Sequence, residues 1–294
     1  MPAPAIHVGP EPKDHLVTAV EAGGGRVVAL EEAEGVVWAG GPDFPAFPER
    51  VRWVQLPAAG VETWMDAVRA QPDIRFTSAA GAYATQVAEH ALALLLAGVR
   101  GIAGYARTRT WSPGGDRVLE GSTVAVIGAG GIGRELIRML EPHDVEVIAV
   151  TRSGRDGTWP VERLGEVWRA ADHFVIAAPA TDGTRHLVGA AELAQMRPHA
   201  WLVNIARGAL IDPDALVQAL REERIGGAAL DVTEPEPLPD DHPLWDEPRA
   251  LITPHVANPP ETMERDLARR VTENVRRFGA GEDLLAPIER DRGY

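Results

Sequence analysis

Four polar residues in the second half of the chain could carry acid–base chemistry on a small anion. Arg207, the acidic pair Glu234 and Glu236, and His255 each stand shortly after an apolar run. An arginine fork can bind a carboxylate and polarise an adjacent carbonyl. A histidine can donate a proton to that carbonyl, and a neighbouring carboxylate would stabilise its protonated form. Each residue alone also fits a structural or surface role, so the hypothesis depends on their joint placement.

The elements that must position these residues are six apolar runs separated by helix-like segments. Because the runs are continuous rather than alternating, we expect strands buried on both faces, in a parallel sheet flanked by helices. Such a doubly wound sheet binds ligands beyond the carboxyl ends of its strands, where the polar residues would converge. The runs are 122–128, 145–150, 173–178, 200–206, 226–232 and 250–254.

The first half predicts a second, smaller α/β layer of the flavodoxin-like kind. It contains five short strand candidates separated by helical or Pro/Gly-rich stretches. A long helical pattern, 85–106, is expected to connect the two layers. We therefore expect a substrate-binding domain at 1–92, completed by a C-terminal helix at 261–294, and a dinucleotide-binding Rossmann domain at 93–260.

Composition excludes several classes of function. The formal net charge of −14 argues against nucleic-acid and anionic-membrane surfaces as partners. The chain has no cysteine, which excludes thiol catalysis and disulfides. Its one lysine, Lys13, is poorly placed for a P-loop or a Schiff base. The first ten residues show no secretion signal and the apolar stretches are too short to span a bilayer, so we expect a cytoplasmic protein.

A glycine-rich segment, GAGGIG, follows the first apolar run of the second half. Gly128, Gly130 and Gly133 have the spacing of a dinucleotide-binding turn, with Gly131 and Ile132 between them. In that turn the first glycine permits the sharp bend, the second lets the backbone approach a pyrophosphate, and the third lets helix and strand pack closely. Methyltransferases use the same glycine spacing, but that alternative explains neither Arg207 nor His255.

The end of the next strand lacks the acid that usually binds the adenosine ribose of NAD. The chain offers Thr151, Arg152, Ser153 and Arg155 instead. Hydroxyl and guanidinium groups suit a 2′-phosphate, which an acid would repel. This indicates a preference for NADP(H), with NAD(H) still possible. A solvated arginine turn is the structural alternative.

Taken together, the motifs resemble the D-isomer-specific 2-hydroxyacid dehydrogenase family over nearly the whole chain. The turn TRSGR is similar to that of its NADP-preferring glyoxylate/hydroxypyruvate reductase branch. The motifs that carry the resemblance are VAEHALALLLAGVR, GSTVAVIGAGGIG, LVNIARGALIDPDALVQAL, GGAALDVTEPEPLPDDHPLW and LITPHVAN.

The resemblance implies specific roles for several residues. It makes Arg207, Glu236 and His255 catalytic, and it selects Glu236 over Glu234 because Glu236 precedes Pro-Leu-Pro. It also implies that a 2-oxo or 2-hydroxy acid is the substrate, that the two lobes form a closing cleft, and that the protein is a homodimer. The substrate carboxylate would meet backbone amides at Ala59, Gly60 and Val61, and further cofactor contacts are expected at Pro179, Thr184, Asn204, Ala206 and Asp231.

Other interpretations of these features remain open. A nucleotide-binding sensor, like the corepressor relatives of the family, would keep the fold without turnover. Trp38, Trp111 and Trp245 could line the substrate pocket or a dimer contact, or simply pack. The remaining histidines show no metal-ligand spacing, so we expect no metal site. Among them, His90 lies in a helical pattern and is expected to orient its neighbours rather than to catalyse.

Overall fold

The computed structural model describes residues 2–111, 114 and 117–291. The chain forms two compact units, and each is described by itself. The first unit contains Met1–Tyr83 and Pro259–Tyr294, and the second contains Ala84–Asn258.

The first unit is built on a five-stranded parallel sheet with the order β2-β1-β3-β4-β5. All five strand candidates of the first half are present, and side chains of β3, β4 and β5 contribute to an apolar cluster that includes Val36, Val54 and Phe76. The strands are β1 (Ala5–Gly9), β2 (Arg26–Val27), β3 (Gly35–Trp38), β4 (Trp53–Gln55) and β5 (Arg75–Thr77).

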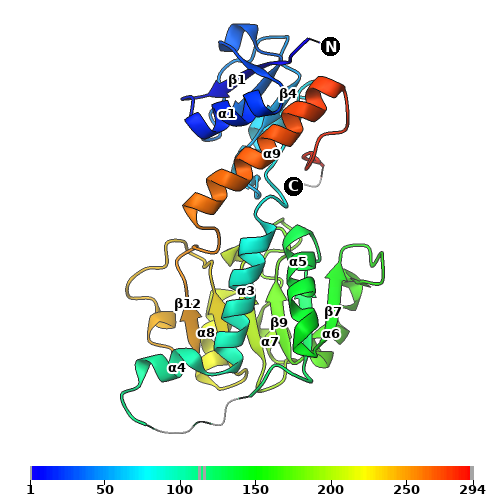
Figure 1. Ribbon diagram of the computed structural model, residues 1–294. Helices are drawn as coiled ribbons and strands as arrows, with labels where there is room; N and C mark the ends of the chain where they lie inside the picture. The colour runs from blue at the N-terminus through cyan, green and yellow to red at the C-terminus, as the bar shows by residue number, and fades with distance from the viewer. Residues whose placement is uncertain (1, 112–113, 115–116, 292–294) are drawn as a thin grey trace. The chain divides into compact units, whose positions relative to one another are not determined.

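The longest helix of the first unit comes from the end of the chain. This helix, α9, lies beside α1 (Figure 1). It begins at a proline, whose missing N–H is no loss in a first helical turn, and Gly281 caps it in the left-handed region at φ 71°. The helices of this unit are α1 (Asp14–Ala22), η1 (Leu30–Glu32), η2 (Glu62–Trp64), α2 (Met65–Arg69) and α9 (Pro260–Ala280).

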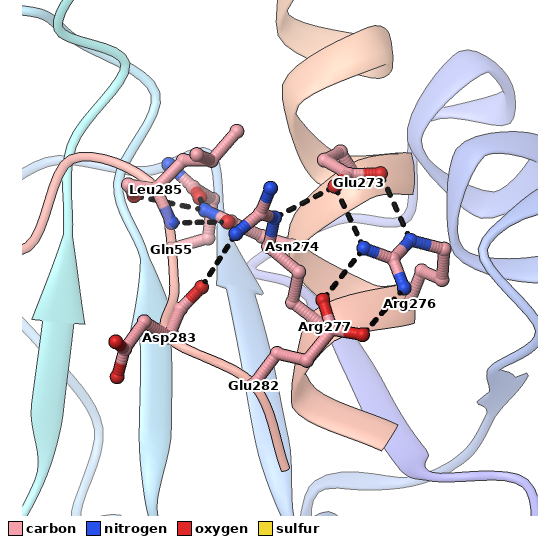
Figure 2. A network of polar contacts seen from close by, with 8 residues as sticks. All are labelled: Gln55, Glu273, Asn274, Arg276, Arg277, Glu282, Asp283 and Leu285. Carbon is pink, nitrogen blue, oxygen red and sulfur yellow. Dashed lines mark hydrogen bonds and ion pairs between the residues drawn. The ribbon is translucent and has the colours of Figure 1, made fainter. Parts of the chain in front are cut away.

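A buried amide network joins α9 to the sheet and to the segment that follows the helix (Figure 2). The Asn274 amide donates to Gln55 Oε1 at 2.7 Å and to the Leu285 carbonyl at 3.2 Å, and it accepts from the Leu285 amide at 2.7 Å. Gln55 in turn accepts from the Thr77 hydroxyl at 2.9 Å. Gln55, Thr77 and Asn274 are fully buried, so every one of these polar groups needs its partner.

The segment after α9 also covers the edge of the first sheet. Thr77 forms an antiparallel bridge with Pro287, and the Ser78 amide donates to the Ala286 carbonyl at 2.9 Å. The Ile288 amide donates to the Phe76 carbonyl at 2.9 Å. These bonds satisfy the backbone of β5, which would otherwise be an open sheet edge.

The second unit is built on a seven-stranded parallel sheet with the order β12-β11-β10-β9-β6-β7-β8. The six strands expected from the apolar runs are all present, which confirms the doubly wound fold. Only β8, a two-residue strand at the sheet edge, was not expected. The strands are β6 (Thr123–Ile127), β7 (Glu146–Thr151), β8 (Trp159–Pro160), β9 (His173–Ile176), β10 (Trp201–Asn204), β11 (Gly227–Leu230) and β12 (Ala250–Ile252).

The helices of the second unit flank this sheet. Helices α3 and α5 lie side by side, and α3 also packs on β10 and β11 (Figure 1). The helices are α3 (Ala84–Val99), α4 (Ile102–Arg107), α5 (Gly131–Leu140), η3 (Glu141–His143), η4 (Val161–Arg163), α6 (Leu164–Ala170), α7 (Ala190–Leu193), η5 (Gly208–Leu210), α8 (Pro213–Arg221) and η6 (Pro243–Trp245).

The single helix expected over 85–106 is broken into α3 and α4. Gly101, at φ 61°, takes a left-handed conformation that ends the first helical segment. The domain boundary expected between 92 and 93 falls inside α3. All of α3 lies in the second unit, because the helix packs so closely there that a Cβ on Gly98 would lie 2.3 Å from the Trp201 ring.

No helix among the described residues is both long and apolar enough to cross a membrane.

A polar cluster at the start of β9 places an uncharged histidine in the core. His173 is 1% exposed, and its Nδ1 accepts from the Trp201 amide at 3.2 Å. Burial lowers the pKa of His173 from 6.5 to about 4, although the negative charge of Asp172 acts to raise it. Burial alone would raise the pKa of Asp172, but hydrogen bonds from the Thr123 amide, His199 and Arg197 bring it down to about 2.

Replacing the buried amide of Asn274 should destabilise the protein. In Asn274→Leu the Leu285 amide and carbonyl and Gln55 Oε1 lose a buried partner, so we expect the free energy of unfolding to fall by about 3 kcal/mol. Urea denaturation followed by circular dichroism measures this loss. The control is Glu273→Gln on the same helix, because Glu273 pairs with Arg276 and Arg277 at the surface (Figure 2). A loss no larger than that of the control would contradict the role of the network.

The His173 ring should make stability fall in mild acid. The unfolded chain takes up a proton at this residue near pH 6.5 and the folded chain only near pH 4, so lowering the pH through that window favours unfolding. The expected loss is about 3 kcal/mol by pH 4. His173→Gln cannot titrate, so urea midpoints measured from pH 7.5 to 4 should decline less steeply than in wild type. Parallel declines in the two proteins would rule out the assignment.

Candidate active site

The glycine segment forms a strand–turn–helix unit with space for a ligand. β6 ends at Ile127, and Gly128 follows at φ 102°, where a Cβ would come within 2.5 Å of the Ala178 amide nitrogen. A Cβ on Gly133 would lie 2.3 Å from the Gly128 carbonyl, so helix α5 packs directly on the turn. Gly130 caps α5, and a Cβ there would meet nothing within 4 Å. This open space above a helix N-terminus, next to Gly131 and Ile132, fits the pyrophosphate of a dinucleotide.

The turn after β7 presents basic side chains and holds itself together through hydroxyls. Thr151 Oγ1 lies 2.6 Å from Thr158 Oγ1 and accepts from the Gly154 amide at 3.2 Å. The Thr151 hydroxyl therefore serves the turn itself. The side chains of Arg152, Ser153 and Arg155 are exposed and available to a ligand.

Two of the other expected cofactor positions organise the loop after β9. The Thr184 hydroxyl donates to the Pro179 carbonyl at 2.8 Å and accepts from the Thr181 amide at 2.8 Å. Because the loop follows a strand at the centre of the sheet, it lies at the same carboxyl edge as the glycine turn.

The loop after β10 carries Arg207 and is shaped by a buried amide. The Asn204 side chain donates to the Arg207 carbonyl at 2.9 Å and accepts from the Ala206 amide at 3.1 Å. The Arg207 guanidinium is partly buried and donates to the Ala206 carbonyl at 2.8 Å. A Cβ on Gly208 would lie only 1.9 Å from the Thr233 carbonyl, so this loop is in backbone contact with the loop after β11.

The expected proton donor, His255, and its expected orienting carboxylate, Glu236, meet directly. His255 Nδ1 and Glu236 Oε1 lie 2.6 Å apart, which is a strong hydrogen bond between groups 19 residues apart in the chain. Glu236 follows β11 and His255 follows β12, and β11 lies between β12 and β10, the strand that precedes Arg207. Both side chains of the pair are about half exposed, at 52% for His255 and 42% for Glu236, so a substrate can reach them.

The competing acid, Glu234, has different partners. It accepts from Arg185 at 2.8 Å and lies 3.3 Å from His186 Nε2. Burial would raise the pKa of Glu234, but the hydrogen bonds from Arg185 and His186 lower it. No local motif predicts this cluster, because Glu234 lies almost 50 residues from Arg185 and His186. The cluster fastens the loop that carries Glu236.

Asp231 is a buried carboxylate that organises the turn carrying His255. It is 2% exposed and accepts from the Thr253 hydroxyl at 2.6 Å and from the amides of Val256 and Ala257 at 2.9 and 3.1 Å. Burial would raise the pKa of Asp231, but the hydrogen bonds, including one from His90, lower it. The carboxylate therefore stays charged and fully paired in the folded state.

The residues expected to bind a substrate carboxylate lie in the first unit. Ala59, Gly60 and Val61 follow β4, and the adjacent Ala58 carbonyl accepts from the Ala79 amide at 2.8 Å. Val61 is buried in the core, and Tyr83 supports the loop by donating to the Pro57 carbonyl at 2.6 Å. Burial raises the pKa of Tyr83 to about 12, so its hydroxyl keeps the proton of this bond.

Trp38, Trp111 and Trp245, the candidates for a pocket wall or a dimer contact, have different surroundings. Trp38 is 6% exposed, packs against Phe44 and donates to the Gly41 carbonyl, so it belongs to the core of the first unit. Trp245 is partly exposed and donates to the Pro239 carbonyl at 2.8 Å. Trp111 is fully exposed. A dimer contact at the last two stays a prediction.

Several known proteins are similar to this chain. A Corynebacterium melassecola protein, described as an uncharacterised protein of the proB 3′ region, is 40% identical, covering 94% of this chain and 96% of its own. Glyoxylate/hydroxypyruvate reductase B of Pectobacterium carotovorum is 32% identical, covering 86% and 85%. A crystal structure of a D-isomer-specific 2-hydroxyacid dehydrogenase from Xanthobacter autotrophicus with NADPH superposes with a TM-score of 0.84 and 26% identity over the whole of both chains.

The family model for the NAD-binding domain of D-isomer-specific 2-hydroxyacid dehydrogenases matches residues 92–257, more than half of the chain. The protein therefore belongs to the D-isomer-specific 2-hydroxyacid dehydrogenase family and is an oxidoreductase that binds a nicotinamide dinucleotide.

Proposed function

We propose that the protein is an NADP(H)-dependent reductase of small 2-oxo acids, with glyoxylate and hydroxypyruvate as the first candidate substrates. The names of the relatives support this substrate class, and the NADPH-bound neighbour supports the cofactor. The observation that carries the proposal is the 2.6 Å hydrogen bond between His255 and Glu236, in the same unit as the glycine turn.

The proposed roles follow from the donors and acceptors of the pair. The Glu236 carboxylate accepts from His255 Nδ1, which leaves Nε2 to hand a proton to the substrate. When bound at the glycine turn, a reduced nicotinamide would supply the hydride for the carbonyl carbon. The proton from Nε2 then goes to the carbonyl oxygen, so that a 2-oxo acid becomes a 2-hydroxy acid. Arg207 would bind the substrate carboxylate and polarise the carbonyl.

The cofactor preference rests on the turn after β7. Arg152, Ser153 and Arg155 expose two cations and a hydroxyl where an acid would stand in an NAD-selective site. A 2′-phosphate there would gain charge-assisted hydrogen bonds from the guanidinium groups.

A substrate panel tests the proposal as a whole. Glyoxylate, hydroxypyruvate and larger 2-oxo acids are each assayed with NADPH and with NADH, following absorbance at 340 nm. We expect turnover of at least one small 2-oxo acid, with a higher kcat/KM for NADPH than for NADH. Tight NADPH binding with no turnover of any acid would instead favour a nucleotide sensor.

Removing the imidazole should abolish most of the turnover. In His255→Ala the proton donor is lost, so kcat should fall by about 10²–10⁴-fold. NADPH affinity, measured by fluorescence titration, should change by less than about threefold because the glycine turn is untouched. His143→Ala, on η3 of the same unit, is the matched control and should keep wild-type kcat. Near-full turnover in His255→Ala would refute the assignment.

Removing the two arginines of the β7 turn should weaken NADPH selectively. The double substitution Arg152→Ser with Arg155→Ser should lower kcat/KM for NADPH by about 10–100-fold, because charge-assisted phosphate bonds are lost. The value for NADH should stay nearly constant. Arg224→Ser, an exposed arginine before β11, is the control. An equal loss of kcat/KM with both cofactors would mean that these side chains do not recognise the 2′-phosphate.

A further inference from the structure

We propose that His90 of α3 is a positioning residue that fixes the turn carrying His255. The inference rests on the proposed function for its catalytic consequence. Its geometric basis lies entirely within the second unit, in the contacts of His90 with Thr253 and Asp231.

The turn that follows β12 needs external support because of its backbone. His255 has φ 53°, a left-handed conformation that few residues other than glycine adopt without strain. Its own amide donates to the Asp231 backbone carbonyl at 2.8 Å. The next two amides, of Val256 and Ala257, donate to the two oxygens of the Asp231 carboxylate. The orientation of the imidazole thus depends on where the Asp231 side chain is held.

Two side chains hold the Asp231 carboxylate from outside the backbone of the turn. The Thr253 hydroxyl is 2.6 Å from Asp231 Oδ1, and His90 Nε2 is 3.0 Å from that hydroxyl and 3.3 Å from the same carboxylate oxygen. A hydroxyl has one proton, and here it goes to the carboxylate, so the hydroxyl can only accept from His90. His90 Nε2 therefore carries a proton and donates towards both oxygens. Phenylalanine or leucine at this position could not do so.

Helix α3 makes a second contact with the same segment. Gln86 lies one helical turn before His90, on the same face, and its amide donates to Asn258 Oδ1 at 3.2 Å. The segment 253–258 is thus tied at its start by His90 and at its end by Gln86. Both ties come from a 16-residue helix with a largely buried inner face.

The same helix packs against the helix that follows the glycine turn. Helix α3 packs along α5, whose first turn begins the proposed pyrophosphate site (Figure 1). One helix therefore contacts both α5, which begins at the cofactor-binding turn, and the turn that carries the proton donor. A small change in the distance between reacting groups lowers the reaction rate strongly. Loss of this shared support would therefore lower kcat more than ligand affinity.

Hydrogen exchange of the turn tests the positioning without any substrate. In the full-length protein, His90→Leu should speed deuterium uptake at the amides of 255–257 at least about tenfold, because their acceptor is no longer held. Peptides from β6 and β9 should exchange as in wild type. Glu89→Gln, an exposed neighbour on α3, should change neither region. Unchanged protection of 255–257 in His90→Leu would overturn the inference even if the enzyme had no activity on any 2-oxo acid.

Kinetics then test the catalytic consequence. With an active 2-oxo acid, His90→Leu should lower kcat about tenfold or more while KM for NADPH stays within about threefold. His90→Gln, which keeps a side-chain N–H, should recover part of the loss. Thr253→Val should give a similar defect, and the double variant should be no worse than the single ones if the two residues act through one network. Additive defects, or a loss of kcat that only follows a lower melting temperature, would contradict the proposal.

Failure of the two proposals can be told apart. Absence of turnover in the wild-type protein would reject the reductase function and leave the exchange experiment to decide the role of His90. Wild-type turnover with normal kcat in His90→Leu would keep the reductase function and reject the positioning role.

Discussion

The buried carboxylate of Asp231 is the constraint on which the site depends. It follows β11 directly, accepts hydrogen bonds from the Thr253 hydroxyl and two consecutive amides, and so fixes a turn whose first residue, His255, lies in the left-handed region. A charged group so deep in the protein is tolerated only because each lone pair finds a donor. The amide donors that it requires, those of Val256 and Ala257, belong to the turn that holds the His255 imidazole beside Glu236.

Close backbone contacts, besides side-chain bonds such as those of Glu234, bring the loops of this edge together. Gly208 touches the Thr233 carbonyl, and Gly133 touches the Gly128 carbonyl, at distances that leave no room for a Cβ. In a parallel sheet the carboxyl ends of neighbouring strands already lie side by side. Glycine at these positions lets consecutive loops approach further, so that a loop after β10 and a loop after β11 can present groups to one small substrate.

The features that the sequence predicts are those set by local pattern. Apolar runs predict every strand of the two sheets except β8, and the rule that ligands bind at the carboxyl edge selects the residues that follow them. The break between α3 and α4 at Gly101 does not follow from the sequence, because a glycine inside a helical pattern lowers helix stability without necessarily ending the helix. β8 has two residues, too few for any periodicity. The partners of Glu234 and His90 depend on contacts across some 50 and 160 residues, which no local pattern encodes.

In the turn after β7, the groups that hold the backbone in shape are not the side chains that are available to a ligand. Thr151 and Thr158 close the turn through their hydroxyls, the Gly154 amide and the Arg155 backbone carbonyl, without using the side chains of Arg152 or Arg155. The arginines are therefore free to change without loss of the turn, and an acid in their place would fit the same backbone. Cofactor choice at this site thus rests on a few exposed charges. The energetic weight of those charges comes from the phosphate that they would meet, because exposed guanidinium groups alone add little to the stability of the fold.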